Sequence, residues 1–367
     1  MKICASILTL LIAFTTLSPA DEPKPDDQAR FLAGISIEGT APSAMAQDSS
    51  WQRHAKEFDS GWKDLEKRQL EKIREWLPQA LGNDTTSRDH LFYFFSGPDF
   101  LYANTFFPNA ATYVFCGLEP VGTAPDVSKL PPGALAASLS NLRKSLNAVI
   151  SFSFFLTKEM KNDLRATQLT GTLPVLYVFM ARLDCRIQSV ELMDLDNEGN
   201  TIPKTQDAQG VKITFTKQNG KPQTLYYFST DLSNSGIKNK PGFIKFCDKL
   251  GTGNSFVKAA SYLMHNGEFT GARDFLLSHS KTLVQDDSGI PYGDFPQEKW
   301  YVACLGRYPG PIEMFKSRYQ RDLASVFNSV KPPPLTFSFG YRWHPNESSI
   351  MIATALSHVP KAVPVSP

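Results

Sequence analysis

The sequence has few cysteines and no excess of charge of either sign. It carries five cysteines in 367 residues, and its formal net charge is only +2. Because nucleic acids are bound by concentrated basic surfaces, this near-neutral charge argues against nucleic acid as a partner. No CxxC pair and no cysteine–histidine spacing typical of zinc occurs. We therefore predict neither a metal site nor a cofactor.

The signatures of several enzyme classes are missing as well. The sequence contains no GxSxG of a serine hydrolase and no HExxH of a zinc peptidase. Residues 250–255 (LGTGNS) lack the Lys-Ser/Thr of a nucleotide loop, so a turn followed by a helix cap explains their glycines. Residues 194–200 (DLDNEGN) resemble a calcium loop without its closing glutamate, and we predict a plain turn there.

Long apolar runs are absent after the first twenty residues. Lys2, an apolar stretch over residues 3–17 and the small residues before position 21 are together typical of a secretion signal. The apolar stretch is too short to span a bilayer comfortably, and no second run of comparable hydrophobicity follows. We predict that residues 1–20 are a signal peptide and that the mature protein is soluble, secreted or periplasmic, with no transmembrane segment.

Four cysteines remain after such a cleavage, because Cys4 lies in the leader. In an oxidising compartment they allow two disulfides with three possible pairings. Two of them end apolar runs, YVFC and YVAC, where a free buried cysteine is equally natural. Both states remain open for Cys116, Cys185, Cys247 and Cys304.

The central stretch of the chain contains short apolar runs that are cut off by turn-forming residues. Residues 91–95 are followed by SGPD, and residues 112–116 are followed by GLEP. Such runs predict buried strands, and loops at strand ends are common places for a site. The 26 phenylalanines predict a large aromatic core, with an aromatic groove for a sugar or lipid as the alternative.

Apolar periodicity predicts several helices. One begins at Ser49, follows an apolar stripe that skips between Leu65 and Leu70, and ends at Pro78; a second follows Pro131 and covers residues 135–149, with a pattern that can extend to 160. Residues 173–183 could form a helix or a strand. Shorter helices are predicted over residues 242–250, 255–265, 270–279 and 312–326.

Further strands are predicted in the second half of the chain. Asn219-Gly220 is a strong hairpin signal between two of them. Residues 335–341 alternate apolar and polar side chains, which predicts a half-exposed strand that pairs with residues 350–356. The remaining strand candidates are residues 187–195, 211–216, 224–228, 282–285 and 299–305.

Together these elements predict an α+β fold with a mixed, partly antiparallel β-sheet packed against long amphipathic helices. Residues 21–50 are expected to form an extended N-terminal arm and residues 359–367 a tail. Between them, residues 51–358 are expected to form a single globular domain, in which similar strand-end motifs allow two weakly related halves.

Acidic residues follow several of the predicted strands. If these strand ends share one edge of the sheet, their carboxylates would meet there and could act as acid and base or hold a divalent cation. The alternative is ordinary turn chemistry, in which each aspartate bonds its own backbone. The catalytic candidates are Asp99, Asp231, Asp286 and Asp287, and the candidates for ligand binding are Glu119, Tyr292 and Arg307.

These features lead to two functional hypotheses of different classes. The first is a non-catalytic binding or structural protein of the periplasm or cell envelope, whose partner is an envelope component or a small molecule. The second is a carboxylate-dependent hydrolase of a glycan or related substrate, in which Asp286 or Asp287 acts with Asp99 or Asp231.

Overall fold

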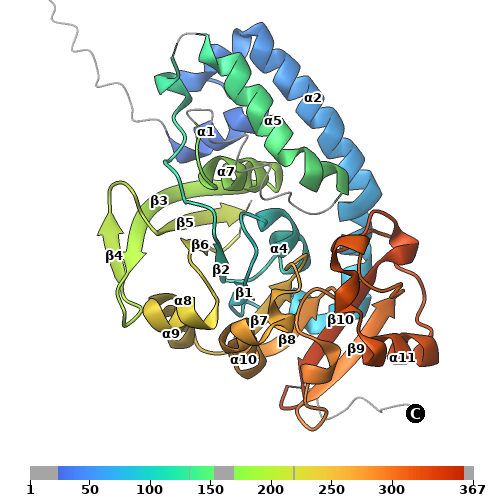
Figure 1. Ribbon diagram of the computed structural model, residues 1–367. Helices are drawn as coiled ribbons and strands as arrows, with labels where there is room; N and C mark the ends of the chain where they lie inside the picture. Colours follow the sequence, from blue (N-terminus) through green and yellow to red (C-terminus); the bar gives the residue numbers. More distant parts are fainter. Residues whose placement is uncertain (1–23, 132, 153–168, 218–219, 359–367) are drawn as a thin grey trace, which may run out of the picture.

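The computed structural model describes residues 24–131, 133–152, 169–217 and 220–358 (Figure 1). Within them, ten strands form one mixed sheet: β1 (Leu91–Tyr93), β2 (Thr112–Gly117), β3 (Cys185–Leu195), β4 (Thr201–Lys204), β5 (Gly210–Lys217), β6 (Gln223–Ser229), β7 (Gly253–Val257), β8 (Ser280–Gln285), β9 (Trp300–Gly306) and β10 (Ser349–Ala355). Their spatial order is β4-β3-β5-β6-β2-β1-β7-β8-β10-β9.

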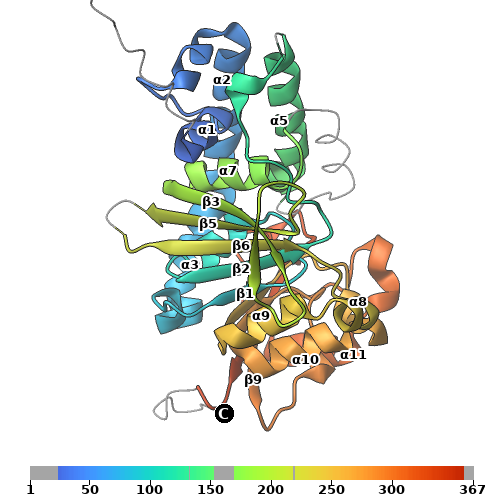
Figure 2. The same ribbon diagram turned by 90° about the vertical axis from the view of Figure 1, so that its left-hand side faces the viewer.

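The central strands β6, β2, β1, β7 and β8 are parallel to one another. Antiparallel strands extend both sides, with β5, β3 and β4 beyond β6 and with β10 and β9 beyond β8. Helices pack on both faces of this sheet (Figure 2). The α+β fold with a mixed, partly antiparallel sheet is thereby confirmed.

Each face of the sheet has its own hydrophobic core. In β1 and the residue after it, Leu91 and Tyr93 contribute to one core, whereas Phe92 and Phe94 contribute to the other. This alternation follows from the two-residue period of a strand, and both faces are apolar because both are covered. The first core includes residues of α1 (Pro25–Leu32), α2 (Ser49–Leu65), α3 (Glu71–Leu81), α4 (Phe100–Phe106), α5 (Ala134–Phe152) and α7 (Leu173–Arg182).

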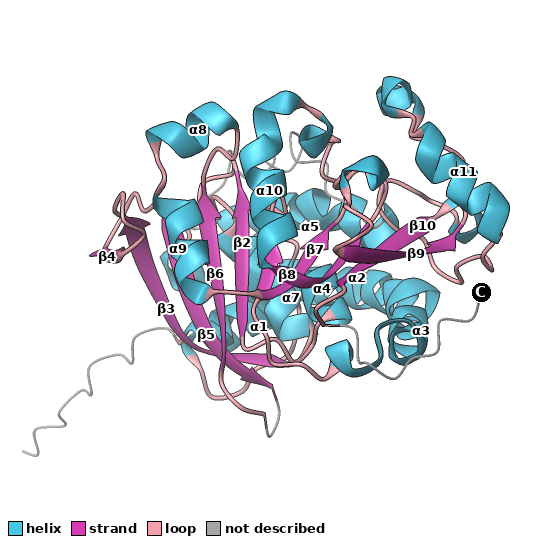
Figure 3. Ribbon diagram, turned by 90° about the horizontal axis from the view of Figure 1, so that it is seen from below, coloured by secondary structure: helices cyan, strands magenta, loops and turns pink. Residues whose placement is uncertain are grey.

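The second core lies under α9 (Gly242–Leu250) and α10 (Thr270–His279), which cover the face that is turned to the viewer in Figure 3. The short helix α8 (Asn234–Asn239) precedes them on the same side. A smaller cluster joins Leu323 and Phe327 of α11 (Arg321–Val330) to Cys304 of β9 and Met351 of β10.

The long N-terminal helix is interrupted where its apolar stripe skips. A single π-helical segment, Glu66–Leu70, separates α2 from α3 and accommodates the extra residue in the stripe. Pro78 lies inside α3, which continues to Leu81, so the predicted end at Pro78 is wrong. The helix begins at Ser49 as predicted, and its N-cap is Asp48, whose side chain accepts a hydrogen bond from the Ser50 amide.

The segment before α2 is not the extended arm that was predicted. Residues 25–32 form the helix α1, and Phe31 and Leu32 are fully buried. The Trp51 indole and the His54 ring both bond to backbone carbonyls of this segment, at 2.9 Å and 2.8 Å. The predicted leader and tail lie outside the described residues.

Two predictions from the C-terminal half are wrong. Residues 253–257 form the buried strand β7 between β1 and β8, where a helix was expected to begin at Ser255. Residues 335–341 are assigned to no strand, and β10 pairs with β8 and β9 instead. Leu335, Phe337 and Phe339 of that segment are nevertheless buried, so its alternation reflects burial on one side rather than pairing with a neighbouring strand.

Other elements agree with the sequence or resolve an ambiguity. Residues 173–182 form the buried helix α7, and β5 and β6 form the predicted antiparallel pair. Residues 312–326 contain a 3₁₀ segment, Glu313–Arg318, and only the first part of α11. The possible extension of the second long helix to residue 160 lies outside the described residues.

Candidate functional site

The connections of the parallel strands open a crevice between β1 and β7. The chain leaves β1 through α4 on one face of the sheet to reach β2, and it leaves β7 through α10 on the other face to reach β8. Where neighbouring strands send their connections to opposite sides, a crevice forms at their carboxyl ends, which is the usual ligand position in α/β sheets.

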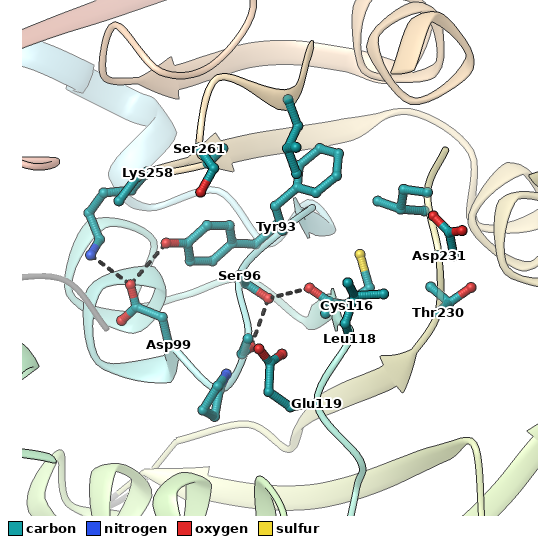
Figure 4. A pocket seen from close by; sticks show the side chains of 18 of the residues that line it. Tyr93, Ser96, Asp99, Cys116, Leu118, Glu119, Thr230, Asp231, Lys258 and Ser261 are labelled. Carbon is teal, nitrogen blue, oxygen red and sulfur yellow. Dashed lines mark hydrogen bonds and ion pairs between the residues drawn. The ribbon is translucent and has the colours of Figure 1, made fainter. Parts of the chain in front are cut away.

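A pocket of about 340 Å³ lies at this position, and we call it the carboxyl-edge pocket (Figure 4). Its walls come from the ends of β1, β2, β6 and β7 and the loops that follow them. The lining residues are Tyr93, Phe95–Asp99, Cys116–Glu119, Thr230–Leu232, Lys258–Ser261, Leu263 and Phe269.

A buried ion pair joins the two diverging loops of the pocket. Lys258 Nζ lies 2.9 Å from Asp99 Oδ2, and the two side chains are only 1% and 2% exposed. The Tyr93 hydroxyl donates a 2.9 Å hydrogen bond to the same carboxylate oxygen, and the ammonium lies 4.1 Å from the centre of the Tyr102 ring. Burial, and after it the Asp99 charge, raises the pKa of Tyr93 well above its ordinary value.

Asp99 also begins the helix that follows β1. Its other carboxylate oxygen accepts the Tyr102 amide at 3.2 Å, which is the usual bond of an N-cap. The same side chain therefore caps α4, binds the Tyr93 hydroxyl and neutralises Lys258. These bonds fix the position of the charged wall before any ligand arrives.

The pocket is bordered by an unusual number of left-handed backbone conformations. Phe95, Ala259, Ser261 and Tyr262 have φ values of 59°, 52°, 52° and 53°. None of them is glycine, and such conformations cost about 1–3 kcal/mol each and concentrate at functional sites. Three of the four lie in the short turn after β7, which we call the 259–262 turn.

The loop after β8 holds this turn in place. The Ala259 amide donates to Asp286 Oδ2 at 3.0 Å, and the Ala260 amide donates to the Ser288 hydroxyl at 2.8 Å. The Tyr262 hydroxyl donates to Asp287 Oδ2 at 2.6 Å. From the opposite side, Tyr341 bonds the turn through its hydroxyl, which donates to the Ala259 carbonyl at 2.8 Å.

Burial changes the ionisation of the two aspartates behind the turn. Burial, and then the charge of the neighbouring Asp286, raises the pKa of Asp287 to about 7. Burial also raises the pKa of Asp286, although bonds from Ser288 and the Ala259 amide oppose the shift. Neither aspartate is among the residues that line the pocket, so both act as supports of its wall.

Glu119 approaches the pocket from the loop after β2, and it is 7% exposed. An ideal Cβ at Gly117 would lie 2.3 Å from Glu119 Oε2, so any other residue at this position would require the carboxylate to move. Tyr227 donates its hydroxyl proton to the Glu119 backbone carbonyl at 2.7 Å and lies 3.4 Å from Oε2. The carboxylate lies beside the Ser96–Pro98 turn in Figure 4.

The rest of the lining is mainly apolar, with a polar edge. Asp231 is exposed, and its carboxylate accepts the Ser233 amide at 2.8 Å, as expected of a turn aspartate. The Ser96 hydroxyl donates to the Gly97 carbonyl at 2.8 Å. The apolar walls come from Phe95, Leu118, Leu232, Leu263 and Phe269.

The structure divides the sequence-predicted residues into three groups. Three line the carboxyl-edge pocket: Asp99, Glu119 and Asp231. Asp286 and Asp287 lie behind the 259–262 turn. Tyr292 and Arg307 do not line the pocket: the Tyr292 amide donates to Gln320 Oε1, and the Arg307 side chain is exposed.

Lys258 and the 259–262 turn are absent from the residues predicted from the sequence. The segment SFVKAAS reads as the start of a helix, which places Lys258 on a helix surface. The available signal is a lysine that directly follows a short apolar run, whereas Asp99 was selected as an acidic residue in the turn that follows such a run.

All four cysteines of the described chain are free and buried. Cys116 contributes to the pocket wall, and burial raises the pKa of its thiol above the ordinary value. This resolves the open question of disulfide state in favour of free thiols.

No protein-family model matches this sequence, and a search of curated proteins finds no match. Among the described residues, no three His, Cys, Asp or Glu side chains gather closely enough to hold a metal ion. None of the described helices combines the length and the apolar character needed to cross a membrane. The chemistry of the pocket is therefore argued from its residues alone.

Proposed function

We propose that this chain is an exported, non-catalytic binding protein that holds a small molecule in the carboxyl-edge pocket. Export is inferred from the N-terminal leader. The observation that supports binding is the position of the pocket, at the crevice between β1 and β7, with walls held in costly backbone conformations. Its volume of about 340 Å³ suits a small ligand rather than a protein segment.

The polar groups of the lining favour binding over catalysis. The Asp99 carboxylate is neutralised by Lys258 and hydrogen-bonded by Tyr93, which lowers its reactivity as a nucleophile. The Ser96 hydroxyl donates to a backbone carbonyl rather than to the side-chain base that a serine nucleophile requires. The lining contains no histidine. Preorganised walls of this kind lower the ordering cost of binding, which is their value to a binding protein.

The alternative proposal is a carboxylate-dependent hydrolase. One observation favours it: a carboxyl group whose pKa is raised to about 7, as at Asp287, has the property of a general acid. Against it, Asp286 and Asp287 support the wall instead of lining the pocket. A hydrolase would have to open the 259–262 turn to bring either group to a substrate.

The binding proposal is tested by filling the pocket. A fragment collection is screened against the chain by ligand-observed NMR, and the hits are measured again with Thr230→Trp, which places an indole at the lining position after β6. We expect Thr230→Trp to abolish binding of hits that compete with one another. Thr201→Trp, at an exposed position on the edge strand β4, is the matched control and should leave their affinity unchanged.

Equal binding of the competing hits to both variants would reject the carboxyl-edge pocket as the ligand site. Hydrolysis of a glycan or ester by the wild-type chain that is lost in Asp287→Asn, without a change in melting temperature, would favour the hydrolase.

A further inference from the structure

Glu119 is a buried carboxylate without a cationic partner among the described residues. Its side chain lies in the wall of the carboxyl-edge pocket at 7% exposure, and the Tyr227 hydroxyl, which donates to the Glu119 backbone carbonyl at 2.7 Å, lies 3.4 Å from its Oε2. No lysine, arginine or histidine of the described chain forms an ion pair with it. Buried charges in proteins are normally paired. The Glu119 carboxylate has no cationic pair among the described residues, and a ligand in the pocket could supply it.

The charges of the remaining lining residues also favour a cationic ligand. Lys258 is the one cation of the described lining, and Asp99 already neutralises it. Asp231 adds a second negative charge at the exposed edge, where its contact is a backbone amide. The pocket therefore carries an excess of negative charge in a partly desolvated space, and such a potential attracts cations.

We propose that the ligand of the carboxyl-edge pocket is a small organic cation, an ammonium or amidinium with an apolar body, whose charge pairs with Glu119. This inference rests on the proposed binding function. The body of the ligand packs against Phe95, Leu118, Leu263 and Phe269. The rings of Phe95 and Phe269 lie edge to face with their centroids 5.8 Å apart, and they offer ring surface to a cation or an aromatic group.

The geometry at Glu119 favours an organic cation over a metal ion. Calcium is held by six to eight oxygen ligands, several of them from the protein, and magnesium by six, usually with one or two carboxylates among them. Among the described residues no cluster of three potential metal ligands is present, so Glu119 would face a metal with too few protein donors. An ammonium needs only one carboxylate and an apolar wall, and both are present here.

The charge of the ligand is tested with three probes of similar shape and different charge: 2-phenylethylammonium, 2-phenylethanol and phenylacetate. Affinities are measured by ligand-observed NMR at constant ionic strength. We expect the ammonium to bind the wild-type chain most tightly and phenylacetate least. Glu119→Gln keeps the size of the side chain and should weaken the ammonium at least about tenfold while leaving 2-phenylethanol unchanged.

Glu198→Gln removes a carboxylate from an exposed turn outside the pocket and is the matched control, with no expected effect on any probe. If 2-phenylethanol or phenylacetate binds as tightly as the ammonium and Glu119→Gln changes nothing, the cation inference is wrong and the binding function stands. If none of the three binds at millimolar concentration, both fail. Calcium binding that is lost in Glu119→Gln and displaces the ammonium would assign the site to a metal and overturn the proposal.

Discussion

Lys258 Nζ and Asp99 Oδ2 lie 2.9 Å apart at the carboxyl edge of the sheet, on side chains that are almost completely buried. The pair connects the loop after β1 to the loop after β7, which the chain topology sends to opposite faces. Removing two charges from water costs several kcal/mol, and their attraction often does no more than offset this cost. The pair therefore positions the two loops more than it increases the free energy of unfolding.

Removing one charge of a buried pair costs more stability than removing both, and this difference gives the first prediction. Lys258→Met leaves the Asp99 carboxylate buried and unpaired, and we expect a loss of about 3–5 kcal/mol in the free energy of unfolding. The double variant Asp99→Asn/Lys258→Met removes both charges and should recover most of that loss, because the asparagine Oδ1 can still accept the Tyr102 amide of the cap and its NH2 group can donate to the Tyr93 hydroxyl oxygen. Urea unfolding measures both.

Lys212→Met is the matched control for this experiment. Lys212 pairs with Glu191 at 3.0 Å on the surface, with both side chains substantially exposed, so its loss should cost less than about 1 kcal/mol. Equal effects of Lys258→Met and Lys212→Met would show that the buried pair does not depend on mutual neutralisation.

Asp286→Ala is predicted to destabilise the fold. The substitution removes the acceptor for the Ala259 amide and for the amide and hydroxyl of Ser288, at 3.0, 3.1 and 2.5 Å. Because these donors are buried or partly buried and the 259–262 turn is strained, we expect a loss of roughly 2–4 kcal/mol. Differential scanning calorimetry measures the change.

Asp196→Ala is the control for Asp286→Ala, because Asp196 also accepts the amides of its own turn but is partly exposed to solvent. Its effect should be much smaller. An Asp286→Ala variant with an unchanged melting temperature would contradict the supporting role of Asp286 and would strengthen the hydrolase alternative.

The stability of the protein should depend on pH through Asp287. In the folded chain this carboxyl keeps its proton up to a pKa of about 7, whereas its ordinary value is 3.8. Its contribution is therefore fully present below pH 3.8 and is lost as the pH rises toward 7, by up to about 1.4 kcal/mol per pH unit. Asp287→Asn keeps an oxygen acceptor for Tyr262 and should remove this loss.

The measurement is urea unfolding of both proteins from pH 4 to pH 8. Burial lowers the pKa of His54 and His265 to about 4, and these histidines favour the folded state increasingly as the pH rises to 6.5. Both proteins share them, so the difference between the two curves reports Asp287 together with its interaction with the neighbouring Asp286. Parallel curves would show that Asp287 is ionised throughout this range.

The local sequence pattern was sufficient to predict much of the fold. The apolar run at residues 91–95 and the stripe that skips between Leu65 and Leu70 correspond to β1 and to the π-helical segment between α2 and α3. In these places the buried positions follow the period of the helix or strand, and that period can be recognised from neighbouring residues alone. The prediction failed at Ser255, because a short buried parallel strand and a buried helix share the same apolar composition.

The acidic residues at strand ends show what the local sequence pattern could not predict. Their position after each strand is visible in the sequence, but Asp99, Glu119 and Asp231 reach one pocket only because β1, β2 and β6 are parallel neighbours. Asp286 looks the same in the sequence and faces the 259–262 turn instead. Pairing between distant strands decides this difference.

The sequence by itself determined the two apolar faces, the strand ends and the near-neutral charge, since each depends on composition and local period. Only the tertiary structure decided that Lys258 meets Asp99, that a strained turn rests on Asp286 and Asp287, and that Glu119 is buried without a cation among the described residues. Those relationships join segments from more than twenty to more than a hundred residues apart, and their energies depend on desolvation, which exists only once the sheet and its helices have closed around them.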